Sequence, residues 1–317
     1  MILNPNNSTI SFGSDDFYSV TSFFMSTFPF MTEIRQVTFN EKKADLGFEI
    51  VKRSAVQARF PHIMKQPGRH TFYIIQFITE GGGRHTIDFK EYHLKAGDVV
   101  FLSKGQIQSF NFETPMDGYM ILFTDDFLSR FSGATSIQAD HRLFNYHIYK
   151  PVLTIKPNQQ EALLSLLDLI FKEYSSNNHS KSEVIYHLLQ VFLLKCNEMR
   201  TSGSEIAIPA TVYQEFQLFK KLADEHLLQN RNVQNYADRM NMNRKKLNEV
   251  VREATGKSVK EYLNAALVLE IKRHLAVNTM SIKELSYATG FDEPTNLIKF
   301  FRKHTDTTPA KFAELYR

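Results

Sequence analysis

The sequence predicts two domains: an N-terminal all-β sandwich or barrel with a pair of helices behind it, and a C-terminal all-α domain. Three observations lead to this class. Short runs rich in β-branched and aromatic residues lie between Arg35 and Asp125. Two apolar helical segments follow between residues 159 and 199. The last third of the chain then shows helix caps and tight turns, and the length of 317 residues fits about two domains.

Residues 1–155 are predicted to form the β domain. Phe72–Ile78 and Val99–Leu102 are bounded by turn residues, which is typical of strands. The glycines at 81–83 follow the first of them and predict a hairpin turn. Because side chains alternate between the two faces of a strand, half of the many aromatic residues should face inward. They would fill a core, or line a pocket that has a few polar anchors such as Arg84 or His93.

Residues 156–200 are predicted to form two antiparallel helices. Gln159–Tyr174 and Ser182–Met199 are rich in Leu, Ile, Val and Phe, and a polar stretch separates them. They carry more apolar surface than one packing face requires, so they are either core or a partner interface. We expect a homodimer through them. Residues 201–211, with Thr201-Ser202-Gly203-Ser204 and Pro209, are the predicted linker.

The positive charge of the chain is concentrated beyond this linker. Residues 210–317 carry 18 Lys and Arg against 13 Asp and Glu, whereas the rest of the chain carries 20 against 21. Nucleic acid is the partner that such an asymmetry suggests, although a solvated basic face gives the same count. No apolar run approaches the roughly 18 residues of a membrane helix, no secretory signal is recognisable, and Cys196 is the single cysteine. These features predict a cytoplasmic protein that does not contact membranes.

Two short amphipathic segments between about residues 230 and 254 predict a helix-turn-helix motif. The first ends at Asn241, which can take a left-handed conformation. Asn243 is a good N-cap for the second, whose apolar face consists of Leu247, Val250 and Val251. The second segment starts with two lysines and an arginine, and such side chains suit guanine edges and phosphates in the major groove.

The same pattern recurs at about residues 281–304. Ser281 begins a predicted capping box, Gly290 suits a left-handed turn, and Pro294 opens the next helix. Between the two motifs, a second capping box at Ser258 begins a long helix that continues to about residue 276. Two motifs joined in this way can contact successive major-groove segments about 34 Å apart. Plain helical hairpins packed as a bundle are the alternative, but matched caps, turns and basic starts in both copies favour DNA binding.

The string from Gly290 to Lys303, followed by Thr307-Thr308-Pro309-Ala310-Lys311-Phe312, resembles the hallmark of AraC/XylS-family transcription regulators. The resemblance covers about the last 90 residues closely. It implies an AraC-type DNA-binding domain at residues 212–317 and a cupin-like, effector-sensing barrel at residues 1–155. Three positions depart from the family: Glu249 stands where many members carry Arg, Asp306 replaces the usual Gly, and Ile271 replaces a common Ala.

Family roles carried across residue by residue give a predicted DNA-contacting set. The expected base contacts are Lys245, Asn248, Glu249, Thr295, Asn296 and Lys299. The expected phosphate contacts are Arg244, Lys246, Arg302 and Lys303. Double-stranded DNA is therefore the expected partner, with a homodimer and RNA polymerase as further candidates. The regulator would be a non-enzyme.

The predicted sensor site is the barrel, with Arg84, His93, Tyr73 and Phe101 as candidate effector contacts. We expect no metal and no cofactor. His62, His70, His85, His93 and Glu80 lack metal-ligand spacing, and Gln108 occupies the turn position where cupins normally carry a metal-binding His. Two alternatives remain open: a DNA-binding regulator without an effector, and a cupin-type enzyme fused to a DNA-binding domain, which Gln108 argues against.

Overall fold

The computed structural model describes residues 9–10, 20–21, 35–37, 46–59, 65, 67–112, 115–131, 142–201, 208–277 and 280–316. The described residues form two compact units that divide between Thr201 and Ile208. We call them the N-terminal unit and the C-terminal unit. Most of the predicted linker lies outside the described residues. No helix among those described is both long and apolar enough to cross a bilayer.

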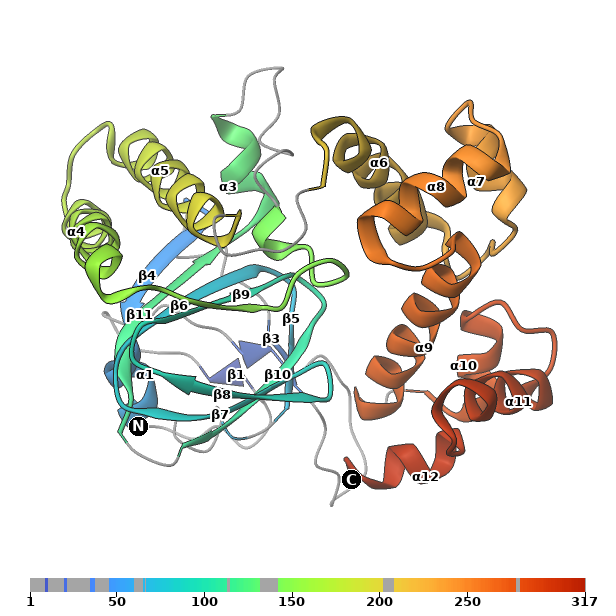
Figure 1. Cartoon of the computed structure of the whole chain (residues 1–317). Helices are drawn as coiled ribbons and strands as arrows, with labels where there is room; N and C mark the ends of the chain where they lie inside the picture. The colour runs from blue at the N-terminus through green and yellow to red at the C-terminus, as the bar shows by residue number, and fades with distance from the viewer. Residues whose placement is uncertain are drawn as a thin grey trace. The chain divides into compact units, whose positions relative to one another are not determined.

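Two five-stranded sheets form the body of the N-terminal unit (Figure 1). The first has the order β3-β5-β10-β7-β8 and the second the order β12-β9-β6-β11-β4. Neighbouring strands are antiparallel, except that β3 and β5 run parallel. The first sheet contains β3 (Arg35–Val37), β5 (Gly68–His70), β7 (Gly82–Ile87), β8 (Lys90–Lys95) and β10 (Ile107–Phe112). The second contains β4 (Phe48–Lys52), β6 (Tyr73–Glu80), β9 (Asp98–Leu102), β11 (Asp117–Phe123) and β12 (Val152–Thr154). A separate pair is formed by β1 (Thr9–Ile10) and β2 (Val20–Thr21).

The turn predicted at Gly81–Gly83 is real, but the hairpin is wrong. Strands β6 and β7 belong to different sheets, so the chain changes sheet at this point. Gly81 has a φ of 75°, and a Cβ at this position would lie 1.9 Å from the Pro115 carbonyl oxygen. Only glycine fits so close a backbone approach. Gly82 and Gly83 continue into β7 and pair with β8.

The second sheet is buried on both faces, which explains its continuous apolar runs. One face contacts the first sheet through residues such as Ile74, Val100 and Leu122, opposite Ile87 and Phe110. The other face packs on the helix pair α4 (Pro157–Tyr174) and α5 (Lys181–Thr201), which lie over it in Figure 1. The predicted helix pair is therefore confirmed. The described part of the unit also contains two shorter helices, α1 (Arg53–Arg59) and α3 (Asp125–Arg130).

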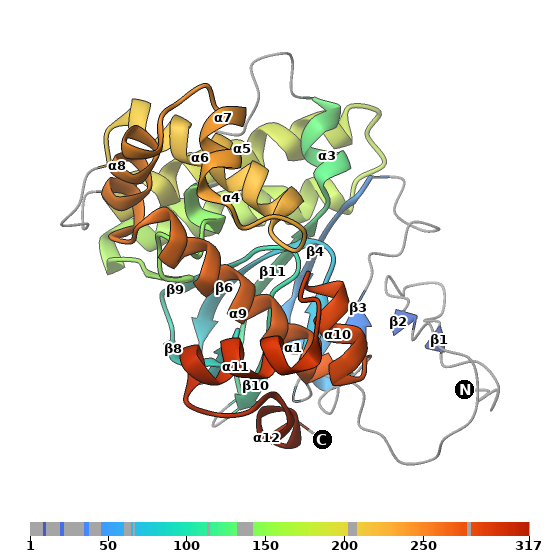
Figure 2. The same cartoon turned by 90° about the vertical axis from the view of Figure 1, so that its right-hand side faces the viewer.

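The C-terminal unit is all-α, as predicted. Its helices are α6 (Ala210–His226), α7 (Val233–Arg239), α8 (Arg244–Thr255), α9 (Val259–Val277), α10 (Ile282–Ala288), α11 (Pro294–Thr305) and α12 (Pro309–Glu314). Two groups of short helices, α7–α8 and α10–α12, lie at opposite ends of the long helix α9 (Figures 1 and 2). An aromatic cluster fixes the first group to α6 and α9. In it the Phe219 ring lies 5.7 Å from that of Tyr236 and 5.2 Å from that of Tyr262.

Candidate functional site

The first helix-turn-helix consists of α7 and α8, and its turn has the predicted chemistry. Asn241 is left-handed with a φ of 52°. The Met242 N–H donates to the Ala237 carbonyl at 2.9 Å, which is the wide hydrogen bond of a Schellman-type helix end. The Asn243 side chain accepts from the Lys246 N–H at 2.8 Å and caps α8. Ala237 is fully buried, so the two helices approach closely at this residue.

Helix α8 exposes a face that carries three charged side chains. Leu247, Val250 and Val251 are buried against the rest of the unit. At 100° per residue, the face opposite them carries Lys245, Glu249 and Arg252 at spacings of four and three residues. All three are exposed. Arg252 was missed by the sequence analysis, although its spacing of seven from Lys245 was a usable signal.

Two residues predicted to contact DNA from α8 have partners inside the unit. The Asn248 side chain donates to the Arg244 carbonyl at 2.9 Å and accepts from the Val259 N–H at 3.0 Å. It therefore helps to satisfy the first turn of α9. The Lys246 Nζ lies 3.4 Å from a carboxylate oxygen of Glu215 on α6. Arg244 is exposed beside them at the start of α8.

The second helix-turn-helix consists of α10 and α11. Ser281 and Glu284 form the predicted capping box at the start of α10. Gly290 is left-handed with a φ of 71°, and the Phe291 N–H donates to the Ser286 carbonyl at 2.9 Å. Pro294 is in the first turn of α11, as predicted. The turn thus repeats the hydrogen bond of the first motif.

Helix α11 presents its predicted polar residues outward. Leu297 and Phe301 are fully buried, and Phe300 is half-buried against Phe291, with ring centroids 5.4 Å apart. The opposite surface consists of exposed residues: Thr295, Asn296, Lys299, Arg302 and Lys303. Thr295, Lys299 and Arg302 are spaced like the three outward residues of α8. The acids nearest this face, Asp292 and Glu293, precede the helix, and the Thr295 hydroxyl donates to Glu293 at 3.1 Å.

The long helix α9 joins the motifs and begins at the predicted capping box. The Ser258 N–H donates to the Glu261 carboxylate at 2.7 Å, and the Glu261 N–H donates to the Ser258 hydroxyl at 3.3 Å. These hydrogen bonds hold the pKa of Glu261 below its usual value. Ile271, one of the departures from the family pattern, is fully buried in this helix.

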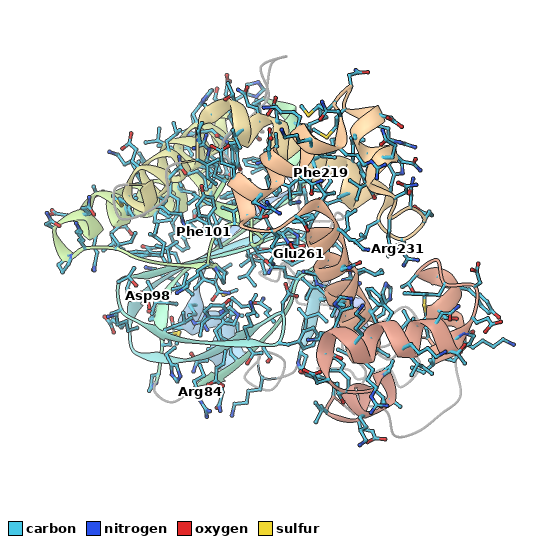
Figure 3. All side chains as sticks on the ribbon, turned by 45° about the vertical axis from the view of Figure 1, so that its right-hand side comes forward. Arg84, Asp98, Phe101, Phe219, Arg231 and Glu261 are labelled. Atoms are coloured by element: carbon cyan, nitrogen blue, oxygen red, sulfur yellow. The ribbon has the colours of Figure 1, made fainter. Side chains whose placement is uncertain are left out.

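The four predicted effector contacts do not meet in one pocket. Arg84 and His93 are paired across β7 and β8, and each lies 3.6 Å from Glu91. They lie on the outer, solvent-facing side of the first sheet, and Figure 3 labels Arg84 there. Tyr73 and Phe101 lie on the helix-covered face of the second sheet, where both rings contact Phe144. None of the four faces the space between the sheets.

A chain of polar side chains occupies that space instead. Arg53 of α1 is fully buried, and its guanidinium donates to the Gln76 amide oxygen and lies 4.2 Å from the centre of the Phe110 ring. The Gln76 amide nitrogen donates to Gln108 at 3.4 Å. Gln108 in turn lies 2.8 Å from ring nitrogens of both His85 and His70. Sequence reasoning missed this cluster because an arginine in a helix gives no signal of burial.

The Arg53 guanidinium sets the direction of every hydrogen bond in this row of polar side chains. Because Arg53 can only donate, Gln76 presents its oxygen to it and its nitrogen to Gln108. The Gln108 oxygen therefore also accepts from His85 Nε2, and its nitrogen donates to His70 Nε2. Burial lowers the pKa of His70 to about 4 and that of His85 well below its usual value, so both rings are neutral at pH 7. The Nδ1 atom of each ring is buried without a hydrogen-bond partner among the described residues.

The helix α1 that carries Arg53 also borders a cavity of about 270 Å³. Ser54, Gln57 and Ala58 of α1 line it, together with Met116, which is part of the apolar cluster between the sheets. The remaining lining residues are Glu80, Pro115 and Asp117. Burial lowers the pKa of Arg53 to about 9, and the nearby Asp117 carboxylate opposes this shift. Arg53 therefore stays charged at pH 7.

Metal and thiol chemistry have no evident centre in the part of the chain that the structure describes. No group of three or more His, Cys, Asp or Glu side chains is placed there to hold a metal ion. His62, one of the histidines considered above, lies outside the described residues. Cys196 of α5 is fully buried in the apolar cluster between the helix pair and the second sheet, and burial raises the pKa of its thiol. It is a packing residue.

Two protein-family models match the two units. The model described as "AraC-like ligand binding domain" matches residues 52–189. The model described as "Helix-turn-helix domain" matches residues 236–314 and spans both motifs. Together they cover more than half of the chain. The protein is a DNA-binding transcription regulator with a ligand-binding domain, and it belongs to the AraC family.

Similar curated proteins are themselves transcription regulators. The Msm operon regulatory protein of Streptococcus mutans is 23% identical over 262 residues, 76% of this chain and 83% of that protein. The transcriptional activator RhaS of Klebsiella pneumoniae is 20% identical over 258 residues, 80% of this chain and 90% of its own. The lactose operon transcription activator of Staphylococcus xylosus is 20% identical over 242 residues, with coverages of 75% and 82%.

Solved structures show distant similarity. ToxT of Vibrio cholerae O395 matches 85% of this chain and 98% of its own, with a TM-score of 0.43 and 12% identity. The DNA-binding domain of AdpA, solved in complex with a target DNA, matches 31% of this chain and 89% of its own. Its TM-score is 0.30 and its identity is 29%.

Proposed function

We propose that the exposed faces of α8 and α11 bind two successive major-groove segments of one operator. The observation that carries this proposal is the repeat of three outward residues with the same spacing on both helices. Lys245, Glu249, Thr295, Asn296 and Lys299 are the proposed base contacts, and Arg244, Arg252, Arg302 and Lys303 are the proposed phosphate contacts. Asn248, expected at a base, and Lys246, expected at a phosphate, have partners within the unit, and in this proposal they support the position of α8.

A DNA-binding titration of the full chain tests this proposal. DNA from upstream of its own gene should bind more tightly than scrambled DNA, with an affinity that falls steeply between about 50 and 200 mM salt. Replacing both Lys245 and Lys299 with Ala should weaken operator binding by at least about 30-fold, since each base contact contributes about 1–3 kcal/mol. Lys283→Ala, an exposed lysine of α10 outside both recognition faces, is the matched control. Equal binding by the double variant and the wild type would overturn the contact assignment.

For the ligand-binding domain, we infer that the effector acts at α1. This helix has Arg53 and its polar chain on the inner side and the 270 Å³ cavity on the outer side. The two unpartnered His Nδ1 atoms offer one donor and one acceptor to a polar ligand that reaches the interior. A ligand that displaces α1 would change every hydrogen bond in the row of polar side chains that begins at Arg53. It would regulate DNA binding through different affinities for two states of the protein.

Thermal unfolding with candidate ligands tests the effector proposal. Lactose and a panel of monosaccharides are first probes, because one relative is named for a lactose operon. A true effector should raise the melting temperature of the wild type by mass action. It should raise that of Gln108→Leu much less, because this variant interrupts the polar chain. If no ligand of a broad panel stabilises the wild type, the regulator without an effector becomes the better account.

We also propose that the chain is a homodimer that assembles through α4 and α5. Exposed apolar side chains gather on these helices: Leu169, Val184, Val191 and Leu194. Residues 184, 191 and 194 fall on one stripe of α5, which suits a partner helix. Sedimentation of the wild type and of a Val191→Glu, Leu194→Glu variant checks this. A wild type that is monomeric at micromolar concentration would rule the interface out.

Such a regulator would act in the cytoplasm, where RNA polymerase is a possible further contact.

A further inference from the structure

Arg231 lies in the segment before α7 but binds the second motif. Its Nη1 donates to the Thr289 carbonyl at 3.0 Å and its Nη2 donates to the Gly290 carbonyl at 2.9 Å. The guanidinium also lies 4.5 Å from the centre of the Phe291 ring. All three partners belong to the turn between α10 and α11. Figure 3 labels Arg231 between the two helix groups.

The turn needs a cation that its own helix does not supply. The carbonyls at the end of a helix carry partial negative charge and favour a nearby Lys or Arg. Helices α7, α8 and α11 each carry a basic residue in their last turn, but the fully described helix α10 carries none. Arg231 therefore caps α10 from the segment that precedes the first motif, with a planar fork that holds two carbonyls at once.

The backbone of the segment between α6 and α7 also meets the second motif at this place. A Cβ on Gly290 would lie 2.2 Å from the Leu228 carbonyl oxygen, so the segment after α6 packs directly on the turn. This contact and the Arg231 hydrogen bonds attach the second motif at a point away from α9. If α9 were the single connection, one motif could rotate relative to the other. A second attachment prevents this rotation.

We propose that Arg231 is a positioning residue that fixes α11 relative to α8 and thereby sets the half-site spacing that the protein accepts. This inference rests on the proposed binding of both helices to one operator. One extra base pair between the half-sites moves the second by about 3.4 Å and rotates it by about 35°. A rigid pair of motifs cannot follow that displacement, while a loosened pair can, at the cost of weaker binding to the best spacing.

The test measures binding of the full chain to operators with zero, one or two base pairs inserted or removed between the half-sites. For the wild type, one base pair should raise Kd by about 10-fold or more. In Arg231→Ala, Kd at the best spacing should rise about 3- to 10-fold, and the penalty for one base pair should shrink to about 3-fold or less. Arg231→Lys keeps the charge but not the two-carbonyl fork, so its spacing penalty should lie between the two. Arg239→Ala is the matched control, because this α7 residue contacts His226 and not the second motif.

Three results would overturn the inference. An unchanged spacing penalty in both Arg231 variants shows that the turn is positioned without the side chain. An equal loss at every spacing, with a salt slope reduced by about one and restored by Arg231→Lys, shows a phosphate contact instead. A wild type that binds operator and scrambled DNA equally overturns the proposed function, and the inference with it. If circular dichroism shows that Arg231→Ala is unfolded, the spacing penalty measured for Arg231→Lys decides whether the inference stands.

Discussion

The two helix-turn-helix motifs share a buried plan and differ on the surface. Their recognition helices correspond at an offset of fifty residues, so Leu247 matches Leu297 and Val251 matches Phe301, all of them buried. The Thr255 hydroxyl donates to the Val251 carbonyl and the Thr305 hydroxyl to the Phe301 carbonyl. Left-handed residues end both helices, with φ of 73° at Gly256 and 56° at Asp306. The helix that follows each motif buries an aromatic ring at the same offset, Tyr262 and Phe312.

The exposed positions follow no such correspondence. Lys245 matches Thr295, Glu249 matches Lys299, and only Arg252 and Arg302 are the same residue type. No hydrogen bond or ion pair engages the Glu249 side chain within the described residues. A free carboxylate at the centre of the helix repels phosphate but can accept from a cytosine or adenine amino group. Packing therefore sets the common scaffold of both motifs, while their exposed side chains vary independently of it.

The largest expected effect is on stability, and it comes from a substitution in the turn between α10 and α11. Gly290→Ala should lower the free energy of unfolding by about 2–4 kcal/mol. It combines a left-handed φ with a Cβ 2.2 Å from a backbone oxygen. Gly256→Ala is the matched control, because its φ of 73° is similar but nothing lies within 4 Å of the added Cβ. It should cost only about 1 kcal/mol. Urea unfolding followed by circular dichroism compares them, and equal losses would contradict the close contact at Gly290.

Effects of intermediate size on DNA binding are expected at the matched positions Glu249 and Lys299. The two substitutions should change the affinity in opposite directions. Glu249→Gln should tighten binding to scrambled DNA by about 3- to 10-fold, because it removes a charge that repels phosphate. It should also relax the base preference at one position of the first half-site. Lys299→Ala should weaken operator binding by about 10-fold and relax the base preference at one position of the second half-site. Fluorescence anisotropy with single-base operator variants measures both, and Glu253→Gln is the control carboxylate off the outward face. Weaker scrambled-DNA binding by Glu249→Gln would contradict the free-carboxylate role.

The smallest effect concerns the second helix end. Asp306→Gly should stabilise the protein by about 0.5–1 kcal/mol, since glycine adopts a φ of 56° without strain and removes an acid from a helix C-terminus. The reverse change in the first motif, Gly256→Asp, should destabilise by a similar amount. Thermal unfolding monitors both changes, and a destabilising Asp306→Gly would point to a specific role of this carboxylate.

Much of the C-terminal unit could be predicted because its signals are local. Capping residues, left-handed turn residues and apolar spacing each act over a few residues, so Asn243, Ser258, Ser281 and Gly290 were placed correctly. What could not be predicted depends on neighbours that are distant in sequence. The partners of Asn248, Lys246 and Arg231 lie on other elements, and no local pattern names them.

The sensor site shows the same limit more sharply. Arg84, one of the predicted effector contacts, is the neighbour of His85 in β7, and a step of one residue along a strand reverses the face. In β7, positions 83, 85 and 87 are buried, so His85 faces the interior and Arg84 faces solvent. The aromatic residues Tyr73 and Phe101 face α4 and α5 because the second sheet is covered on both sides. Strands of that kind have no polar face to reveal their orientation.

By itself the sequence determined the order of domains, the helix ends of both motifs and the excess of positive charge in the C-terminal unit. Each of these depends on the backbone preferences or the charge of neighbouring residues, which act before the chain is packed. Only the tertiary structure decided which polar groups are withdrawn from solvent. Arg53, His70 and His85 became one hydrogen-bonded chain between the sheets, and Arg231 became the cap of a helix 51 residues further along. Burial and hydrogen-bond partnership arise from which distant segments come together, and that is a property of the packed molecule.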